Sequence, residues 1–141
     1  GAAVSILQAA KTADQFESLM PIAAPLDLIA VIPGMTVEKA MLLDDKCYSN
    51  ISGIDVTNRF IKELAATDMP GAVRNIKSPV LLIHGRNDSV VDYSNTRIFT
   101  DNCRRSCRQV TIDDGDHNLT RDSDISVINR AVTTWLGEFN A

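Results

Sequence analysis

The chain has 141 residues, of which 45% are hydrophobic and 23% are charged, and its net charge is -4. A chain of this length and composition is expected to form one domain with a single core, burying roughly two-thirds of its unfolded surface. The acidic balance excludes a nucleic-acid partner, because that binding draws its affinity from Lys and Arg side chains that neutralise phosphates.

The first part of the chain predicts a helix and then a strand. Residues 2–13 have apolar side chains at helical spacing, which favours a helix packed on a sheet. Residues 18–24 form an apolar run that predicts a buried strand, although Pro21 cannot donate to a strand ladder. The longest apolar stretch, 19–35, contains three prolines and an aspartate and so predicts no membrane-spanning helix. The N-terminus also lacks the basic region of a signal peptide.

The middle of the chain, residues 26–76, has an irregular helical pattern. It predicts a helix over 37–43 capped by Thr36 and another over 56–66 capped by Asp55. The expected buried stripe of the second helix comprises Val56, Phe60 and Leu64. The segment Met69-Pro70-Gly71 is expected to end this helical part.

The last part of the chain alternates strands and helices. A continuous apolar run predicts a strand over 80–83 that is covered on both faces, and the pattern beyond it predicts a helix over 93–102, a strand over 109–112 and a helix over 125–139. The last helix is expected to be capped by Asp122 or Ser123 and to bury Ile125, Ile128, Val132, Trp135 and Phe139. The whole order predicts an α/β fold with about three parallel strands and right-handed crossovers.

Two ionisable residues follow consecutive predicted strands. Asp88 follows the strand over 80–83, and His117 follows the strand over 109–112. Because the ligand crevice of a parallel sheet lies beyond the carboxyl ends of its strands, the two are expected to meet. An acid and then a base in this order are what a Ser-His-Asp mechanism needs. Each alone has a plainer interpretation, as a turn aspartate or an exposed loop histidine, but together they favour a catalytic pair.

The remaining candidate residues are less informative. His84 ends its strand and is interpreted as a packed or supporting histidine, because the base is expected later in the chain. Ser5, Ser49 and Ser52 were considered as nucleophiles, but no stretch of the chain reads G-x-S-x-G. With two histidines, neither near a cysteine pair, a zinc site is not expected, and neither is any other metal or cofactor.

Two segments carry a resemblance to a known family. Residues 76–91 (IKSPVLLIHGRNDSVV), and Gly115-Asp116-His117 followed by a helix ending in Trp135-Leu136, resemble the acid and base motifs of α/β hydrolases of the serine aminopeptidase, acylglycerol lipase and dienelactone hydrolase type. The resemblance extends over nearly the whole chain, as that family's C-terminal half. Residues 1–10 resemble the helix after the nucleophile elbow, and residues 19–25 resemble the next strand.

This resemblance implies a partial hydrolase domain over 1–141. It implies that Asp88 is the acid and His117 the base, with a helix and strand in 1–25, a lid and helices in 26–76, and the acid- and base-bearing strands in 77–141. The nucleophilic serine is expected two residues before Gly1. Since loss of the nucleophile lowers kcat on the order of a millionfold, the chain alone is expected to be inactive. The apolar residues of the lid either face an acyl group or pack as ordinary helices: Ile29, Val31, Ile32, Met35 and Met41.

Two other functions stay open. One is a noncatalytic α/β interaction module that self-associates through the exposed edge of the strand at residues 19–25, since unpaired edges recruit partners; an N-terminal fragment is an alternative partner. The other is a thiol switch at Cys103 and Cys107, which lie beside three arginines. The odd number of cysteines, with Cys47 as the third, favours reduced thiols and a cytoplasmic location.

Overall fold

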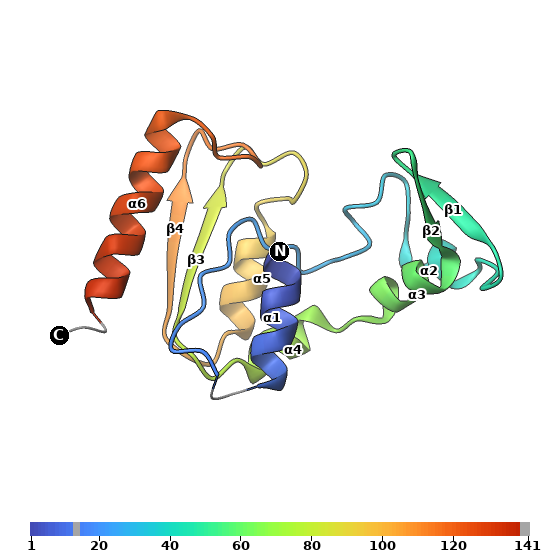
Figure 1. The fold of residues 1–141 in the computed structure, drawn as a ribbon, viewed down its shortest axis with the longest axis horizontal. Helices are drawn as coiled ribbons and strands as arrows, with labels where there is room; N and C mark the ends of the chain where they lie inside the picture. The colour runs from blue at the N-terminus through green and yellow to red at the C-terminus, as the bar shows by residue number, and fades with distance from the viewer. Residues whose placement is uncertain (13–14, 139–141) are drawn as a thin grey trace. The chain divides into compact units, whose positions relative to one another are not determined.

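The computed structural model describes residues 1–12 and 15–138 of the chain (Figure 1). The chain forms two compact units, the first made of residues 1–26 together with 70–141 and the second of residues 27–69. Within the described ranges, none of the helices has the length and apolar character needed to cross a membrane. The two units have separate hydrophobic cores and are described in turn.

The first unit is built on two parallel strands, β3 (Val80–Gly85) and β4 (Cys107–Ile112). Their register pairs Val80 with Cys107 and Gly85 with Ile112, so the two strands end together. Every residue of β3 is buried, as the continuous apolar run predicted for a strand covered on both faces. Figure 1 shows α6 on one side of these strands and α1 and α5 on the other.

A third segment pairs with β3 without forming a regular strand. Leu19 and Ile22 make isolated parallel bridges to Val80 and Ile83, in place of the continuous strand expected over 18–24. Pro21 has no N–H to donate, and Ala23 adopts a positive φ of 49° that ends the extended run. The predicted layer of about three parallel strands is therefore two regular strands and one irregular segment.

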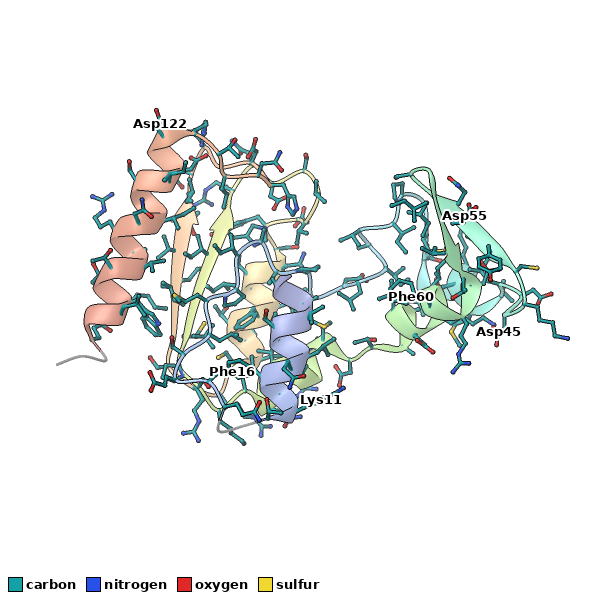
Figure 2. The ribbon with its side chains drawn as sticks, in the orientation of Figure 1. Lys11, Phe16, Asp45, Asp55, Phe60 and Asp122 are labelled. Carbon is teal, nitrogen blue, oxygen red and sulfur yellow. The ribbon has the colours of Figure 1, made fainter. Side chains whose placement is uncertain are left out.

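The helices at the ends of the first unit are α1 (Ala2–Lys11) and α6 (Asp122–Gly137). Helix α1 buries Ile6 and Ala9 and ends at Lys11. Residue 13 of the predicted helix lies outside the described residues. Helix α6 begins three residues earlier than predicted. Asp122 therefore lies in its first turn and not at the cap, which is Arg121 (Figure 2).

The buried face of α6 differs in part from the prediction. Trp135 is 2% exposed and packs with Leu81, Ile83 and Ile112, while Ile128 and Val132 pack against this cluster. Ile125 is 43% exposed, so its place in the predicted stripe is wrong. The earlier start of the helix makes this residue the fourth of α6, whereas the prediction had it as the first. Phe139, the last predicted member, lies outside the described residues.

Two further helices lie entirely or mostly within the first unit. Helix α5 (Asn95–Asn102) begins two residues later than predicted, with Ser94 as its cap. Helix α4 (Met69–Asn75) was not predicted, because the segment Met69-Pro70-Gly71 was expected to end the preceding helical region. Pro70 fits its first turn, because the N–H that proline lacks has no helical partner there.

The second unit contains α2 (Val37–Met41), the hairpin of β1 (Tyr48–Ile51) and β2 (Ile54–Thr57), and α3 (Asn58–Ala66). Thr36 caps α2 as predicted, by accepting a hydrogen bond from the Lys39 amide. The hairpin was not predicted. Its turn is Ser52-Gly53, both at positive φ, and a two-residue turn of this kind matches the twist of paired strands.

The hairpin explains why the predicted start of α3 is wrong. Asp55 lies in β2 opposite Asn50, whose amide donates to its carboxylate at 2.7 Å. Thr57 caps the helix instead, accepting a hydrogen bond from the Phe60 amide. The core of the unit therefore centres on Ile61, with Ile29, Ile32 and Ala40. Phe60, expected to be buried, is 48% exposed on α3 (Figure 2).

Candidate active site

The candidate site lies in the two loops that follow β3 and β4. Two main-chain hydrogen bonds join these loops: the Arg86 amide donates to the Ile112 carbonyl at 2.9 Å, and the Asn87 amide donates to the Gly115 carbonyl at 2.8 Å. The parallel register therefore continues past the last strand pair, and the two loops leave the sheet side by side.

The loops approach each other at two glycines. A Cβ atom on Gly85 would collide with the carbonyl oxygen of Gly115 and would lie 2.7 Å from the carbonyl oxygen of Asp116. A Cβ atom on Gly115 would lie 2.9 Å from Gly85 Cα. Since these neighbours are mostly main-chain atoms, which cannot rotate away, only glycine fits this contact.

Asp88 and His117, the two predicted site residues, are brought together by these loops. The Nδ1 atom of His117 lies 2.8 Å from Oδ2 of Asp88. The other carboxylate oxygen, Oδ1, accepts hydrogen bonds from the amides of Val90 at 2.9 Å and Val91 at 2.8 Å. The side chain of Asp88 is fully buried, whereas that of His117 is 35% exposed. The carboxylate is thus fixed by the turn, and the imidazole has one edge open.

The surroundings of Asp88 lower the pKa of its carboxyl group. Burial is the largest single influence and raises the pKa, but the hydrogen bonds from the Val91 amide, the His117 ring and the Val90 amide together outweigh it. The carboxylate form is therefore favoured at neutral pH, which is the form that accepts a hydrogen bond from Nδ1–H.

This arrangement prepares His117 to act as a base. With Nδ1–H donating to Asp88, the unprotonated Nε2 atom carries the lone pair that can accept a proton. Among residues 1–12 and 15–138, no hydroxyl group forms a hydrogen bond with Nε2. Ser5 donates to the Gly1 carbonyl of its own helix, and Ser49 donates to Asn58 Oδ1.

His84 lies beside the pair, where sequence analysis placed a packed or supporting histidine. It is 0% exposed, and its Nε2 atom is 3.3 Å from Asp88 Oδ2 and 3.0 Å from the Val91 carbonyl oxygen. These two contacts were not predicted. Its position four residues before Asp88 was the only available signal, and such a spacing is too common in sequences to indicate a contact.

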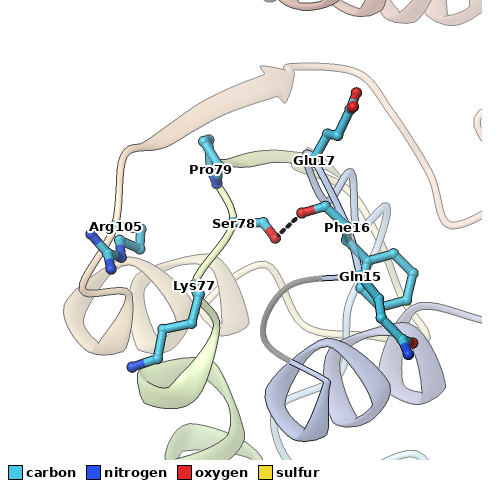
Figure 3. A pocket seen from close by; sticks show the side chains of 7 residues that line it. All are labelled: Gln15, Phe16, Glu17, Lys77, Ser78, Pro79 and Arg105. Atoms are coloured by element: carbon cyan, nitrogen blue, oxygen red, sulfur yellow. Dashed lines mark hydrogen bonds between the residues drawn. The ribbon is translucent and has the colours of Figure 1, made fainter.

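A cavity of about 610 Å³ lies at the other end of β3 (Figure 3). Lys77 and Arg105 line it with cationic side chains, and Glu17 contributes an acidic one. Ser78 donates a hydrogen bond to the Phe16 carbonyl at its centre. Since Ser78 and Pro79 precede β3, this cavity opens at the amino end of the strand, and Asp88 and His117 lie past its carboxyl end.

The cysteines and the possible metal ligands are the other candidates, and the thiol switch expected at Cys103 and Cys107 stays a prediction. Cys47, Cys103 and Cys107 are free thiols, and the cytoplasmic location that their number favours stays a prediction. The described part of the chain has no group of three or more His, Cys, Asp or Glu side chains that could hold a metal ion. The Asp88–His117 pair is therefore the strongest candidate for chemistry.

Comparison with protein families gives one match. The family described as serine aminopeptidase, S33, matches residues 44–124, which is more than half of the 141 residues and includes both Asp88 and His117. No curated protein sequence matches the chain.

Several solved structures share the fold at low sequence identity. Est1E from Butyrivibrio proteoclasticus is 19% identical with a TM-score of 0.80, over 100% of this chain and 58% of its own. Alpha/beta hydrolase domain-containing protein 10 from mouse is 18% identical with a TM-score of 0.75, over 99% and 59%. A monoacylglycerol lipase from Paleococcus ferrophilus is 15% identical with a TM-score of 0.69, over 96% and 64%. The chain thus spans less than two-thirds of each of these structures.

Proposed function

Because the chain belongs to the serine aminopeptidase family of α/β hydrolases, we propose that it supplies the acid and the base of a serine hydrolase. The substrate is a carboxylic ester, thioester or amide. The observation that carries this proposal is the 2.8 Å contact between His117 Nδ1 and Asp88 Oδ2 at the shared end of two parallel strands. The fold shared with Est1E supports it.

In the proposed reaction, Nε2 of His117 removes the proton from a serine hydroxyl as its oxygen attacks the carbonyl carbon. Asp88 holds Nδ1–H and stabilises the imidazolium that forms. His117 then returns the proton to the leaving group, which departs and leaves an acyl-enzyme. Water enters and the same proton transfers release the acid. The chain contains no G-x-S-x-G stretch, so we propose that the serine and the oxyanion-binding amides come from polypeptide outside these residues.

The relatives favour an ester among the three substrate classes. Similar solved structures include an esterase domain and a monoacylglycerol lipase, and one structure of Est1E has ferulic acid bound. Ferulic acid is a carboxylic acid, as the product of ester hydrolysis must be. We therefore propose ester hydrolysis first, with thioesters and amides as the other classes to be tested.

A fluorophosphonate probe tests the proposed function, because it labels only an activated serine. The chain alone should remain unlabelled. Addition of a polypeptide that carries the missing part of the fold, including G-x-S-x-G, should restore labelling, and His117→Ala in this chain should abolish it. Asp113→Asn, which removes an exposed carboxylate from the same loop, is the matched control and should label as the unchanged chain does. Absence of labelling in a folded complemented protein would refute the proposal.

We also propose that residues 27–69 act as a lid over the substrate. The support is that these residues form a compact unit with a core of their own and interrupt the unit that carries Asp88 and His117. Replacement of 27–69 by a short linker, in the complemented protein, should keep probe labelling while changing the preference for acyl chain length. An unchanged preference would show that the unit does not contact the substrate.

The outer edge of the segment at residues 19–22 is the proposed partner site. The amides of Leu19 and Ala23 donate to carbonyl groups of Pro79 and Ile83. Because main-chain groups alternate in direction along an extended segment, those of Met20 and Ile22 face away from β3. The side chains of these two residues are 36% and 41% exposed. Unpaired edges of this kind pair with other strands. We propose that a second copy, or an N-terminal polypeptide, pairs here. Light scattering should show a dimer that Met20→Pro dissociates, and a stable monomer that takes up no added fragment would oppose this.

A further inference from the structure

His84 occupies a closed position at the end of β3. Its side chain is 0% exposed. The imidazole ring packs edge-to-face with the ring of Tyr93, with ring centroids 5.8 Å apart and an interplanar angle of 81°. A buried polar ring at a strand end requires hydrogen-bond partners. The identity of those partners determines what the ring does.

The Nε2 atom of His84 faces two acceptors. The Val91 carbonyl oxygen lies at 3.0 Å and Asp88 Oδ2 at 3.3 Å. Since a carbonyl and a carboxylate only accept hydrogen bonds, Nε2 must carry the proton and donate. In the described part of the chain the buried Nδ1 atom has no partner. The single-proton tautomer with hydrogen on Nε2 fits this site, because a second proton on Nδ1 would be buried without an acceptor.

The carboxylate of Asp88 therefore lies among four donors. The amides of Val90 and Val91 hold Oδ1, while His117 and His84 approach Oδ2. Without His84, Oδ2 would keep only the donor from His117, whose ring is partly exposed. The Val91 carbonyl would also lose its partner, which loosens the turn that places the carboxylate. His84 thus restrains the carboxylate through a fully buried side chain.

We propose that His84 is a positioning residue for the acid: its Nε2–H, shared between Asp88 Oδ2 and the Val91 carbonyl, holds the carboxylate in the orientation that fixes the Nδ1–H tautomer of His117. This inference rests on the proposed function only because that function gives Asp88 and His117 a reaction to catalyse. His84 touches no reacting atom, and its effect passes through Asp88. The proposal therefore concerns the state of His117, which can be measured without any substrate.

Nuclear magnetic resonance of the isotope-labelled chain tests the proposal. In the unchanged chain, the proton on His117 Nδ1 should give a low-field resonance, and the ring nitrogen shifts should report one tautomer. In His84→Leu the low-field resonance should be lost and the two tautomers should mix. In His84→Gln, whose terminal amide nitrogen reaches the place of Nε2, the resonance and the single tautomer should return.

Leu82→Ala is the matched control. Leu82 lies on the same strand and the same face, two residues before His84, and is 1% exposed, so its truncation weakens the core without removing a donor from Oδ2. This variant should keep the low-field resonance. If it loses the resonance as completely as His84→Leu does, or if a folded His84→Leu keeps both the resonance and the single tautomer, the positioning role is wrong.

The experiment stays decisive if His84→Leu fails to fold. His84→Asn keeps a polar side chain of smaller size that cannot reach Oδ2, and it should show the same loss; a retained resonance would overturn the proposal. The proposed hydrolase function fails by a different observation, the absence of probe labelling in the complemented protein. The two failures can therefore be told apart.

Discussion

Asp88 is the residue on which the geometry of the candidate site depends most. It is buried, it accepts two amide hydrogen bonds through Oδ1, and it meets His117 through Oδ2. Burial raises its pKa, and the hydrogen bonds from Val91, His117 and Val90 lower it by more, so its pKa in the folded chain lies below the ordinary value. A carboxyl group with a lowered pKa stabilises the folded state most when it is ionised.

Asp88→Asn should destabilise the chain in a pH-dependent manner. At pH 7 we expect the free energy of unfolding to fall by about 1–3 kcal/mol, because an amide group cannot satisfy the same donors. The difference should persist above the ordinary carboxyl pKa and disappear as the pH falls through the lower, folded-state value. Urea unfolding between pH 7 and pH 3 measures this. Asp113→Asn, at an exposed ion pair with Arg86, should change stability by less than about 1 kcal/mol.

Cys103 should be the most reactive thiol of the chain. The pKa of the Cys103 thiol is lowered to about 6, mainly by a hydrogen bond from Cys107. Burial raises this pKa, and a backbone hydrogen bond at Arg105 lowers it further. The same interaction raises the pKa of Cys107. Since the thiolate is the nucleophile, iodoacetamide at pH 7 should modify Cys103 before Cys107, with a rate that falls below about pH 6. Peptide mass spectrometry would show this, and Cys107→Ala should slow the reaction.

Among the elements, the loops after β3 and β4 are joined by the contact between Gly85 and Gly115. Gly85→Ala should destabilise the chain by about 1–3 kcal/mol, because its Cβ atom would press on the Gly115 carbonyl. It should also weaken the low-field resonance of His117 by separating the loops. Gly137→Ala, at the end of α6 with nothing near its Cβ, should leave stability unchanged or raise it. Thermal unfolding of the two variants makes the comparison.

The helices show which local signals in a sequence are reliable. Thr36 capped α2 as predicted, because its hydroxyl meets an amide within the same turn and no distant residue intervenes. Asp55 failed as the cap of α3 because a hairpin competes for the same residues and places its carboxylate on Asn50. The Ser52-Gly53 turn was a signal for that hairpin, but its two strands have only four residues each and none of those residues is fully buried. Pro21 correctly weakened the expected strand at residues 18–24.

At the scale of the whole molecule, each of the two units has a hydrophobic core among the described residues. One surrounds Ile83 and Trp135 in the first unit, and the other surrounds Ile61 in residues 27–69. Ile61→Ala should lower the stability of the second unit by about 2–5 kcal/mol through the cavity it leaves. Hydrogen exchange should therefore accelerate in α2 and α3 while β3 and β4 keep their protection. Equal acceleration in both units would show that they unfold together.

The part of the candidate site that follows from the order of strands along the chain could be predicted from the sequence. Consecutive parallel strands must end at one edge, so the meeting of Asp88 and His117 followed from their places after those strands. The contacts of His84 and the approach of the two glycines did not follow. They depend on sub-ångström placement of loops, which neither spacing nor composition determines, and on burial that only the assembled fold creates.

The paired glycines also limit how this chain can be recombined with its relatives. A gene chimera with a crossover between residues 85 and 115 would take the two loops from different parents, and any parent with a larger residue at either place would introduce a side chain into a backbone contact. Chimeras that inherit 85–115 as one block should express as folded protein. Those divided within it should be depleted from a shuffled library.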